Sequence, residues 1–78
     1  MVNGNKQFRA VKFREMMRVF KELGFDEAER NTKITLRHGD GRAIKVNNHA
    51  GNTDINRHVL RKLLREGNIV EDKFVERL

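Results

Sequence analysis

The sequence contains no cysteine, no tryptophan and no tyrosine, and each absence excludes a class of structure or chemistry. Without cysteine the chain can form neither a disulfide nor a thiolate nucleophile. Its five phenylalanines fall mostly at positions whose spacing predicts a core, so few rings remain to stack on nucleic-acid bases. No apolar run approaches the roughly 18 residues of a membrane span, and no secretory leader is recognisable. We therefore expect a cytoplasmic protein without a membrane partner.

The charge is strongly one-sided. The 78 residues include 17 Lys and Arg against 11 Asp and Glu, which gives a formal net charge of +6. Such a balance favours a polyanionic partner, above all nucleic acid. The length allows one small domain. We assign residues 8–78 to this domain and the polar, aperiodic residues 1–7 to a flexible tail.

The apolar periodicity predicts an α+β fold of order α-β-β-β-α followed by a short C-terminal helix. The expected elements are a helix over Val11–Leu23, strands over Phe25–Glu29, Thr32–Arg37 and Ala43–Val46, a helix over His58–Glu66, and a short helix over Val70–Leu78. Gly39–Gly41 is a turn signal that makes the last two strands a hairpin. We expect both main helices on one face of an antiparallel sheet. The core should hold the phenylalanines and methionines.

Caps and apolar stripes add detail to this prediction. The polar segment 47–56 reads as a loop in which Thr53, Asp54 or Asn56 could cap the second main helix. That helix places Val59, Leu60, Leu63 and Leu64 in one apolar arc. In the last segment, Val70, Phe74 and Leu78 recur at a spacing of four and predict a stripe that docks on the core.

The second main helix also carries a basic stripe. Arg57, Arg61 and Arg65 run opposite its apolar arc, and Lys62 and His58 border them. This stripe favours anion binding, although cations near a helix C-terminus also offset the helix dipole. Strand alternation turns further cations away from the core. These are Lys33, Arg37 and Lys45.

Three histidines are the groups suited to proton transfer near pH 7. His38 borders the hairpin turn and is expected to be exposed, and His58 opens the basic helix. His49 lies in the Asn-rich loop between strand and helix, where functional residues are often placed. Their spacing matches no metal-ligand motif, so we predict no metal and no cofactor. If the protein is an enzyme, this pattern favours a metal-independent nuclease that uses histidine acid–base chemistry.

Three segments together resemble the HicA (YcfA-like) family, small mRNA interferase toxins of type II toxin–antitoxin systems. They are VKFREMMRVFKELGF, RNTKITLRHGDGRAIKVNNH and VLRKLLREGNIVEDKF, within Val11–Phe74. The resemblance implies a fold like that of double-stranded-RNA-binding domains. It also implies RNA as the substrate and a HicB-like antitoxin as a protein partner.

The same resemblance breaks at the position credited with catalysis. Members of the family carry Gly-Ser-His at the start of the second strand, and that triplet corresponds here to Asn31–Thr32–Lys33. The family's second histidine, in a Pro-x-His pattern, matches His49, with Asn47 in place of the proline. The resemblance therefore makes Lys33 and His49 the candidate catalytic pair.

Three hypotheses follow. In the first, a HicA-like toxin cleaves RNA, with Lys33 holding a phosphate and His49 moving a proton. In the second, a non-catalytic module binds RNA through a set of surface cations. These are Arg37, Lys45, Arg57, Arg61, Lys62 and Arg65. In the third, the same basic patch meets an acidic protein partner. A protonated lysine is a poor general base, which favours binding over cleavage.

Overall fold

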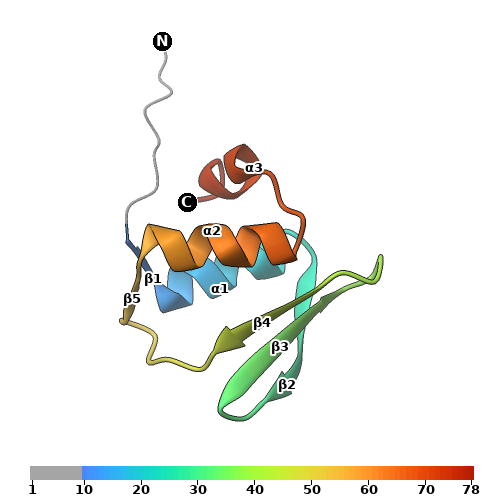
Figure 1. Ribbon diagram of the computed structural model, residues 1–78, viewed down its shortest axis with the longest axis horizontal. Coiled ribbons are helices and arrows are strands. Elements are labelled where there is room, and N and C mark those ends of the chain that lie inside the picture. The colour runs from blue at the N-terminus through green and yellow to red at the C-terminus, as the bar shows by residue number, and fades with distance from the viewer. Residues whose placement is uncertain (1–9) are drawn as a thin grey trace.

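The computed structural model describes residues 10–78, and the expected tail over residues 1–7 lies outside them. The elements run in the order β1 (Val11–Lys12), α1 (Phe13–Glu22), β2 (Phe25–Arg30), β3 (Lys33–His38), β4 (Ala43–Asn47), β5 (Asp54–Ile55), α2 (Arg57–Glu66) and α3 (Glu71–Val75) (Figure 1). The predicted α+β class is confirmed, and the arrangement is consistent with a double-stranded-RNA-binding-like domain. In the part of the chain described, no helix is long and apolar enough to cross a membrane.

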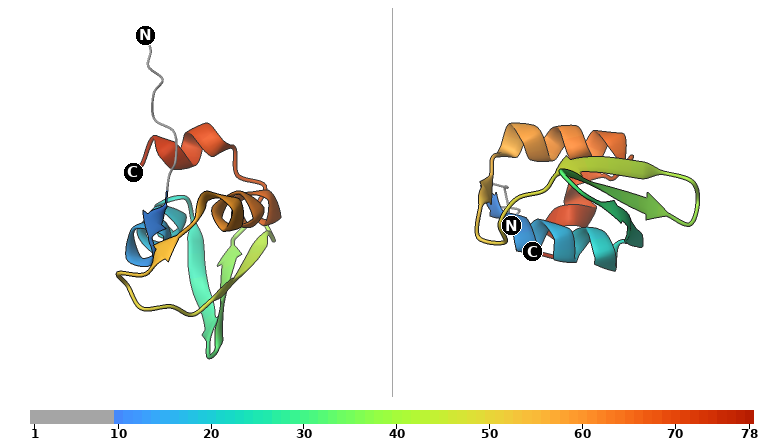
Figure 2. Two further views of the ribbon diagram at one scale, coloured as in Figure 1. Left: turned by 60° about the vertical axis from the view of Figure 1, so that its left-hand side comes forward. Right: turned by 90° about the horizontal axis from the view of Figure 1, so that it is seen from below.

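The three-stranded sheet has the order β2-β3-β4, and both of its strand pairs are antiparallel. Ile34 lies opposite Val46 and Leu36 opposite Ile44, and all four side chains are buried. Both main helices pack over this face, α1 beside β2 and α2 beside β4 (Figure 2). The helices and the last segment contribute the rest of the core. The fully buried side chains that these segments contribute are Met16, Val19, Phe20, Leu60 and Phe74.

The first helix begins two residues later than expected. Val11 and Lys12 form the short strand β1, which pairs antiparallel with Asp54 and Ile55 of β5. Lys12 Nζ also lies 2.9 Å from Asp54 Oδ1. A strand of two residues has no detectable alternation, so only its distant partner identifies it. The helix ends at Glu22, and Gly24 follows with a φ of 100°, in the left-handed region that glycine favours.

The second main helix is capped by one of the three candidates. The Asn56 side chain accepts hydrogen bonds from the backbone N–H groups of His58 and Val59, so α2 begins at Arg57. The helix ends at Glu66 and is followed by its C-cap residue Gly67, which is buried against β4. A Cβ at this position would lie 2.6 Å from Ile44 Cδ1. Glycine therefore allows α2 to approach the sheet closely.

Two of the expected apolar stripes are wrong in part. In the last segment Phe74 is fully buried, but Val70 and Leu78 are 64% and 43% exposed. The helix α3 is only five residues long and includes neither Val70 nor Leu78. Its buried pair is Phe74 and Val75. On α2, Val59 is 45% exposed and does not join the core arc. Phe13, like Phe20, Phe25 and Phe74, is buried as predicted, whereas Phe8 and Met1 lie outside the described residues.

Candidate nucleic-acid interface

A cleft of about 330 Å³ opens between β4 and α2. Four of the basic residues singled out in the sequence line it, and they come from four different parts of the chain. They are Lys33 of β3, Lys45 of β4, His49 of the following loop and Lys62 of α2. We call this site the lysine cleft. Its apolar wall includes Met16, Val46 and Leu63.

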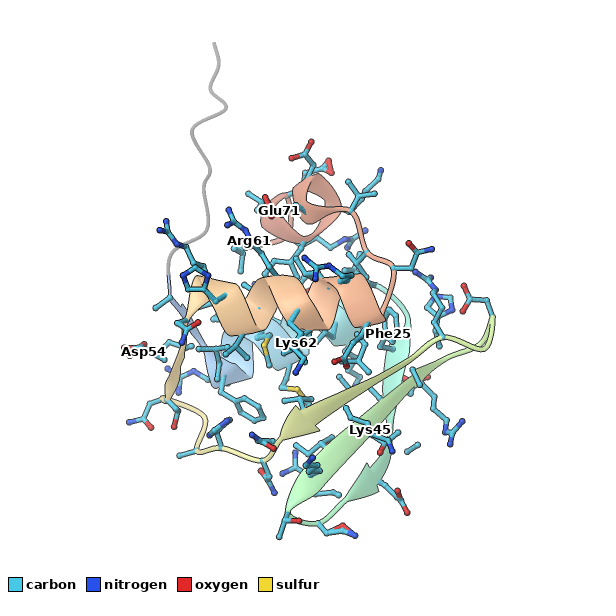
Figure 3. All side chains as sticks on the ribbon, in the orientation of Figure 1. Phe25, Lys45, Asp54, Arg61, Lys62 and Glu71 are labelled. Carbon is cyan, nitrogen blue, oxygen red and sulfur yellow. The ribbon has the colours of Figure 1, made fainter. Side chains whose placement is uncertain are left out.

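The sheet register brings two of the lysines together. Lys33 lies opposite Asn47, and Lys45 lies opposite Thr35, so the two lysines are diagonal neighbours on adjacent strands. Both are exposed. Figure 3 shows Lys62 on the side of α2 nearer the sheet, above the strand β4 that carries Lys45. Three cationic side chains from three elements thus border one opening.

The charge of these lysines is not balanced by the fold. Within residues 10–78, none of Lys33, Lys45 and Lys62 forms an ion pair with an acidic side chain. Glu66 is the one acidic residue among those that line the cleft. The lysine cleft therefore has a net positive charge, which suits it to bind an anion.

His49 is held in place by the loop that carries it. On one side the Asn48 backbone N–H donates to Thr32 O at 3.1 Å, and the Asn48 amide donates to Asn31 O at 3.0 Å. On the other side the loop carbonyls of Thr53 and Gly51 accept the first backbone N–H groups of α1. The polar loop predicted from the sequence is thus bound at both ends.

The ring of His49 packs against a buried side chain. Its centroid lies 5.5 Å from that of Phe13, with the two rings nearly perpendicular. His49 is nevertheless exposed, so the imidazole is fixed along one edge and accessible to a ligand. Within the lysine cleft it is the one imidazole, a side chain that can both donate and accept a proton.

None of the four predicted RNA-binding arginines lines the lysine cleft. Arg37 is at the opposite end of β3, across from Asp26 of β2, and Arg57 is in the first turn of α2. Arg61 and Arg65 line a different hollow, next to α3. Figure 3 shows Arg61 on the α3 side of α2.

The basic stripe of α2 also meets an acid that the helix itself does not carry. Arg61 Nε lies 3.1 Å from Glu71 Oε1, and Glu71 belongs to α3. A helical projection of α2 alone shows only Glu66, at its end, as an acidic group. The stripe is therefore partly neutralised by the next element of the chain.

His38 differs from its predicted role as an exposed turn residue. Its side chain is half-buried, with its ring centroid 5.0 Å from that of Phe25. A Cβ on Gly24 would lie 2.7 Å from His38 Nε2, so the histidine also packs on that glycine. Its Nδ1 accepts the Asp40 backbone N–H at 3.1 Å. His38 is therefore a packing residue of the hairpin.

Arg42 is a structural residue that sequence reasoning missed. Its Nη1 donates to the carbonyls of Gly67 at 2.8 Å and Asn68 at 3.2 Å, where α2 ends, and its Nε donates to Asp40 Oδ2 at 2.8 Å. The guanidinium also lies 5.2 Å from the centre of the Phe25 ring. Its carbonyl partners lie 25 and 26 residues away, so no local pattern reveals this role.

The contacts of Arg42 also affect Asp40. The hydrogen bond from the Arg42 backbone N–H is the main cause that lowers the pKa of the Asp40 carboxyl, and the guanidinium lowers it further.

Among residues 10–78, no group of three or more His, Asp or Glu side chains is placed to hold a metal ion. No protein-family model matches this chain, and a search of curated proteins finds no match either.

Proposed function

We propose that the chain is a HicA-like RNA-binding protein of the cytoplasm, a toxin component or a relative of one, which holds the RNA phosphate backbone in the lysine cleft. One observation carries this proposal. Lys33, Lys45 and Lys62 border the same opening, and none of them is paired with an acidic side chain of residues 10–78. Like charges that border one opening repel one another, and a polyanion relieves that repulsion.

The aromatic residues favour contact with the backbone over stacking on bases. Phe13, Phe20, Phe25 and Phe74 are each at most 4% exposed, so within residues 10–78 no phenylalanine offers a ring to a base. His49 is the one exposed ring in the lysine cleft. RNA binding in this site should therefore depend on phosphates and on little sequence readout.

Binding is favoured over cleavage. Lys33 and His49 line the same cleft, so the two candidate catalytic residues share one site. A lysine ammonium has three hydrogen-bond donors and no acceptor, so Lys33 is better suited to hold a phosphate than to accept a proton. Besides His49, the only other acid–base side chain among residues 10–78 that lines the cleft is Glu66, near the end of α2, and with Lys33 in place of a histidine we expect cleavage to be slow or absent.

The HicB-like antitoxin partner has one feature in its favour. Val59 is 45% exposed and lines the lysine cleft, which gives a protein partner an apolar contact next to the cations. An acidic antitoxin would then compete with RNA for the same site. Competition between an acidic protein and RNA for the purified chain would support this part of the proposal.

The proposal is tested by RNA titration of two variants of equal net charge. Lys45→Ala/Lys62→Ala removes two cations from the lysine cleft, and Lys21→Ala/Lys73→Ala removes two exposed lysines of α1 and α3. At about 0.1 M salt each lost phosphate contact weakens binding about fivefold, so the cleft variant should bind about 25-fold more weakly. The matched variant should stay within about threefold of wild type. Equal losses in both would show that net charge, and not the lysine cleft, attracts RNA.

A further inference from the structure

A second hollow adjoins the lysine cleft on the other side of His49. Its volume is about 270 Å³. Its lining consists of Phe13, Arg14, Met17, Arg30, His49 and Gly51. We call it the arginine hollow. His49 is the one residue that lines both sites, so a single side chain separates them.

The positive charge available in the arginine hollow comes from Arg14. Arg30 is already bound to Glu27, with its Nη2 3.0 Å from Glu27 Oε2, and it contacts Asn48 as well. Arg14 is exposed and forms no ion pair with any of residues 10–78. By contrast Arg18, one turn further along α1, is bound to both Glu15 and Glu22.

The start of α1 does not itself provide an anion site. The backbone N–H groups of Phe13 and Arg14 donate to Thr53 O at 2.8 Å and Gly51 O at 3.0 Å, so they are already used. What remains in the arginine hollow is the Arg14 guanidinium, next to a glycine that leaves space. A Cβ on Gly51 would lie 3.5 Å from Arg14 Cβ, an ordinary contact distance.

We infer that Arg14 forms a second phosphate subsite, and that a single RNA strand in the lysine cleft continues across His49 into the arginine hollow. This inference rests on the proposed function. The strand places one phosphate among Lys33, Lys45 and Lys62 and a later one at Arg14. The sugar-phosphate link between them then lies over the imidazole of His49. Because one side chain separates the hollows, a flexible single strand can follow this path.

The inference predicts an effect that depends on RNA length. An RNA of about eight nucleotides, within the range one small domain covers, reaches both sites, whereas a dinucleotide fills only one. Arg14→Ala should weaken binding of the longer RNA about fivefold at about 0.1 M salt, as expected for one lost phosphate contact. Arg14→Ala should bind the dinucleotide with the same affinity as Lys21→Ala does. Lys21 is the matched control because it is an exposed cation on the same face of α1, two turns away.

The longer RNA is measured by fluorescence anisotropy and the dinucleotide by NMR titration of the backbone amides. A second variant, Gly51→Leu, fills the arginine hollow without changing the charge and should weaken the longer RNA as Arg14→Ala does. If Arg14→Ala and Gly51→Leu bind it like Lys21→Ala, while Lys45→Ala/Lys62→Ala binds weakly, the second subsite is wrong and the lysine cleft stands. If Lys45→Ala/Lys62→Ala also matches Lys21→Ala/Lys73→Ala, both proposals are wrong.

Discussion

The two ends of the sheet use charged residues in opposite ways. At the hairpin end, which we define by Phe25, His38, Asp40, Arg42 and Gly67, each charged or ring nitrogen group has a partner within the fold. At the other end, the lysine cleft presents three lysines that form no ion pair within residues 10–78, with Glu66 as its single acidic lining residue. The first arrangement stabilises the domain.

The second arrangement does not serve folding. Lys33 and Lys45 are diagonal neighbours on adjacent strands, so their mutual repulsion costs the domain a little stability. A contact made with a ligand can offset that loss only when the ligand is bound. The comparison therefore separates a hairpin end whose charges are paired within the fold from a lysine cleft whose cations are not, and the cleft is where we propose that RNA binds.

The largest expected effect concerns catalysis in the lysine cleft. Lys33→His supplies a second proton carrier beside His49 and should raise RNA cleavage by at least about 100-fold, since acid–base catalysis contributes 10²–10⁴-fold. Arg37→His is the matched control, because it places a histidine on the same strand but at the hairpin end. Cleavage of a labelled RNA is measured with a chelator present to inhibit contaminating metal-dependent nucleases.

The catalytic prediction has a direct internal check. His49→Ala in the Lys33→His protein should return cleavage to the wild-type level. Strong cleavage by the wild type that His49→Ala abolishes would instead make His49 sufficient as the acid–base group. The chain would then be an active RNase despite Lys33.

The next effect concerns the packing of α2 on the sheet. A methyl group at Gly67 would overlap Ile44 Cδ1, so Gly67→Ala should lower the free energy of unfolding by about 1–3 kcal/mol. Gly39→Ala is the matched control, since a Cβ there meets nothing within 4 Å. Chemical denaturation measures both. If the two variants are equally stable, α2 does not approach β4 this closely.

A smaller loss is expected from the arginine of the hairpin end. Arg42→Ala removes the donors to Gly67 O and Asn68 O and should lower the free energy of unfolding by about 1–2 kcal/mol. Arg37→Ala, which removes an exposed arginine of the same hairpin, should change it by less than about 0.5 kcal/mol. RNA affinity of the folded Arg42→Ala protein should match wild type. A large loss of RNA affinity would show that the hairpin end also affects RNA binding, which would contradict the division between the two ends.

The smallest predicted effect is on pH dependence. Hydrogen bonds from Arg18, from Arg30 and from the Arg42 backbone lower the pKa of Glu22, Glu27 and Asp40, respectively. A carboxyl whose pKa is lower in the folded state stabilises the fold above its unfolded pKa. That contribution is lost as the pH falls below about 4, and denaturation at several pH values should show it. Asp40→Asn should lower stability at neutral pH and weaken this acid dependence.

Much of the fold can be predicted from apolar spacing alone. Ile34, Leu36, Ile44 and Val46 alternate along two strands, and this pattern correctly gives the hairpin and its core face. The pairing of β1 with β5 could not be found this way, because two residues carry no period and their partners are over 40 positions away. Local periodicity identifies long elements, whereas short paired segments depend on tertiary structure.

The candidate site shows the same division. Strand alternation turned Lys33 and Lys45 outward, and the helical projection placed Lys62 on the border of the basic stripe, but no pattern showed that the three meet. That convergence depends on α2 lying beside the edge strand β4. The pairing of Arg61 with Glu71 was missed for the same reason, since it joins two elements.

The salt dependence of RNA affinity tests the central claim most directly. Each phosphate contact of a single strand contributes about 0.7 to the slope of log affinity against log salt concentration. The slope should therefore become shallower by about 1.4 in Lys45→Ala/Lys62→Ala and stay at the wild-type value in Lys21→Ala/Lys73→Ala. A slope that is the same in all three proteins would contradict the account, because the lysine cleft would then make no contact with phosphate.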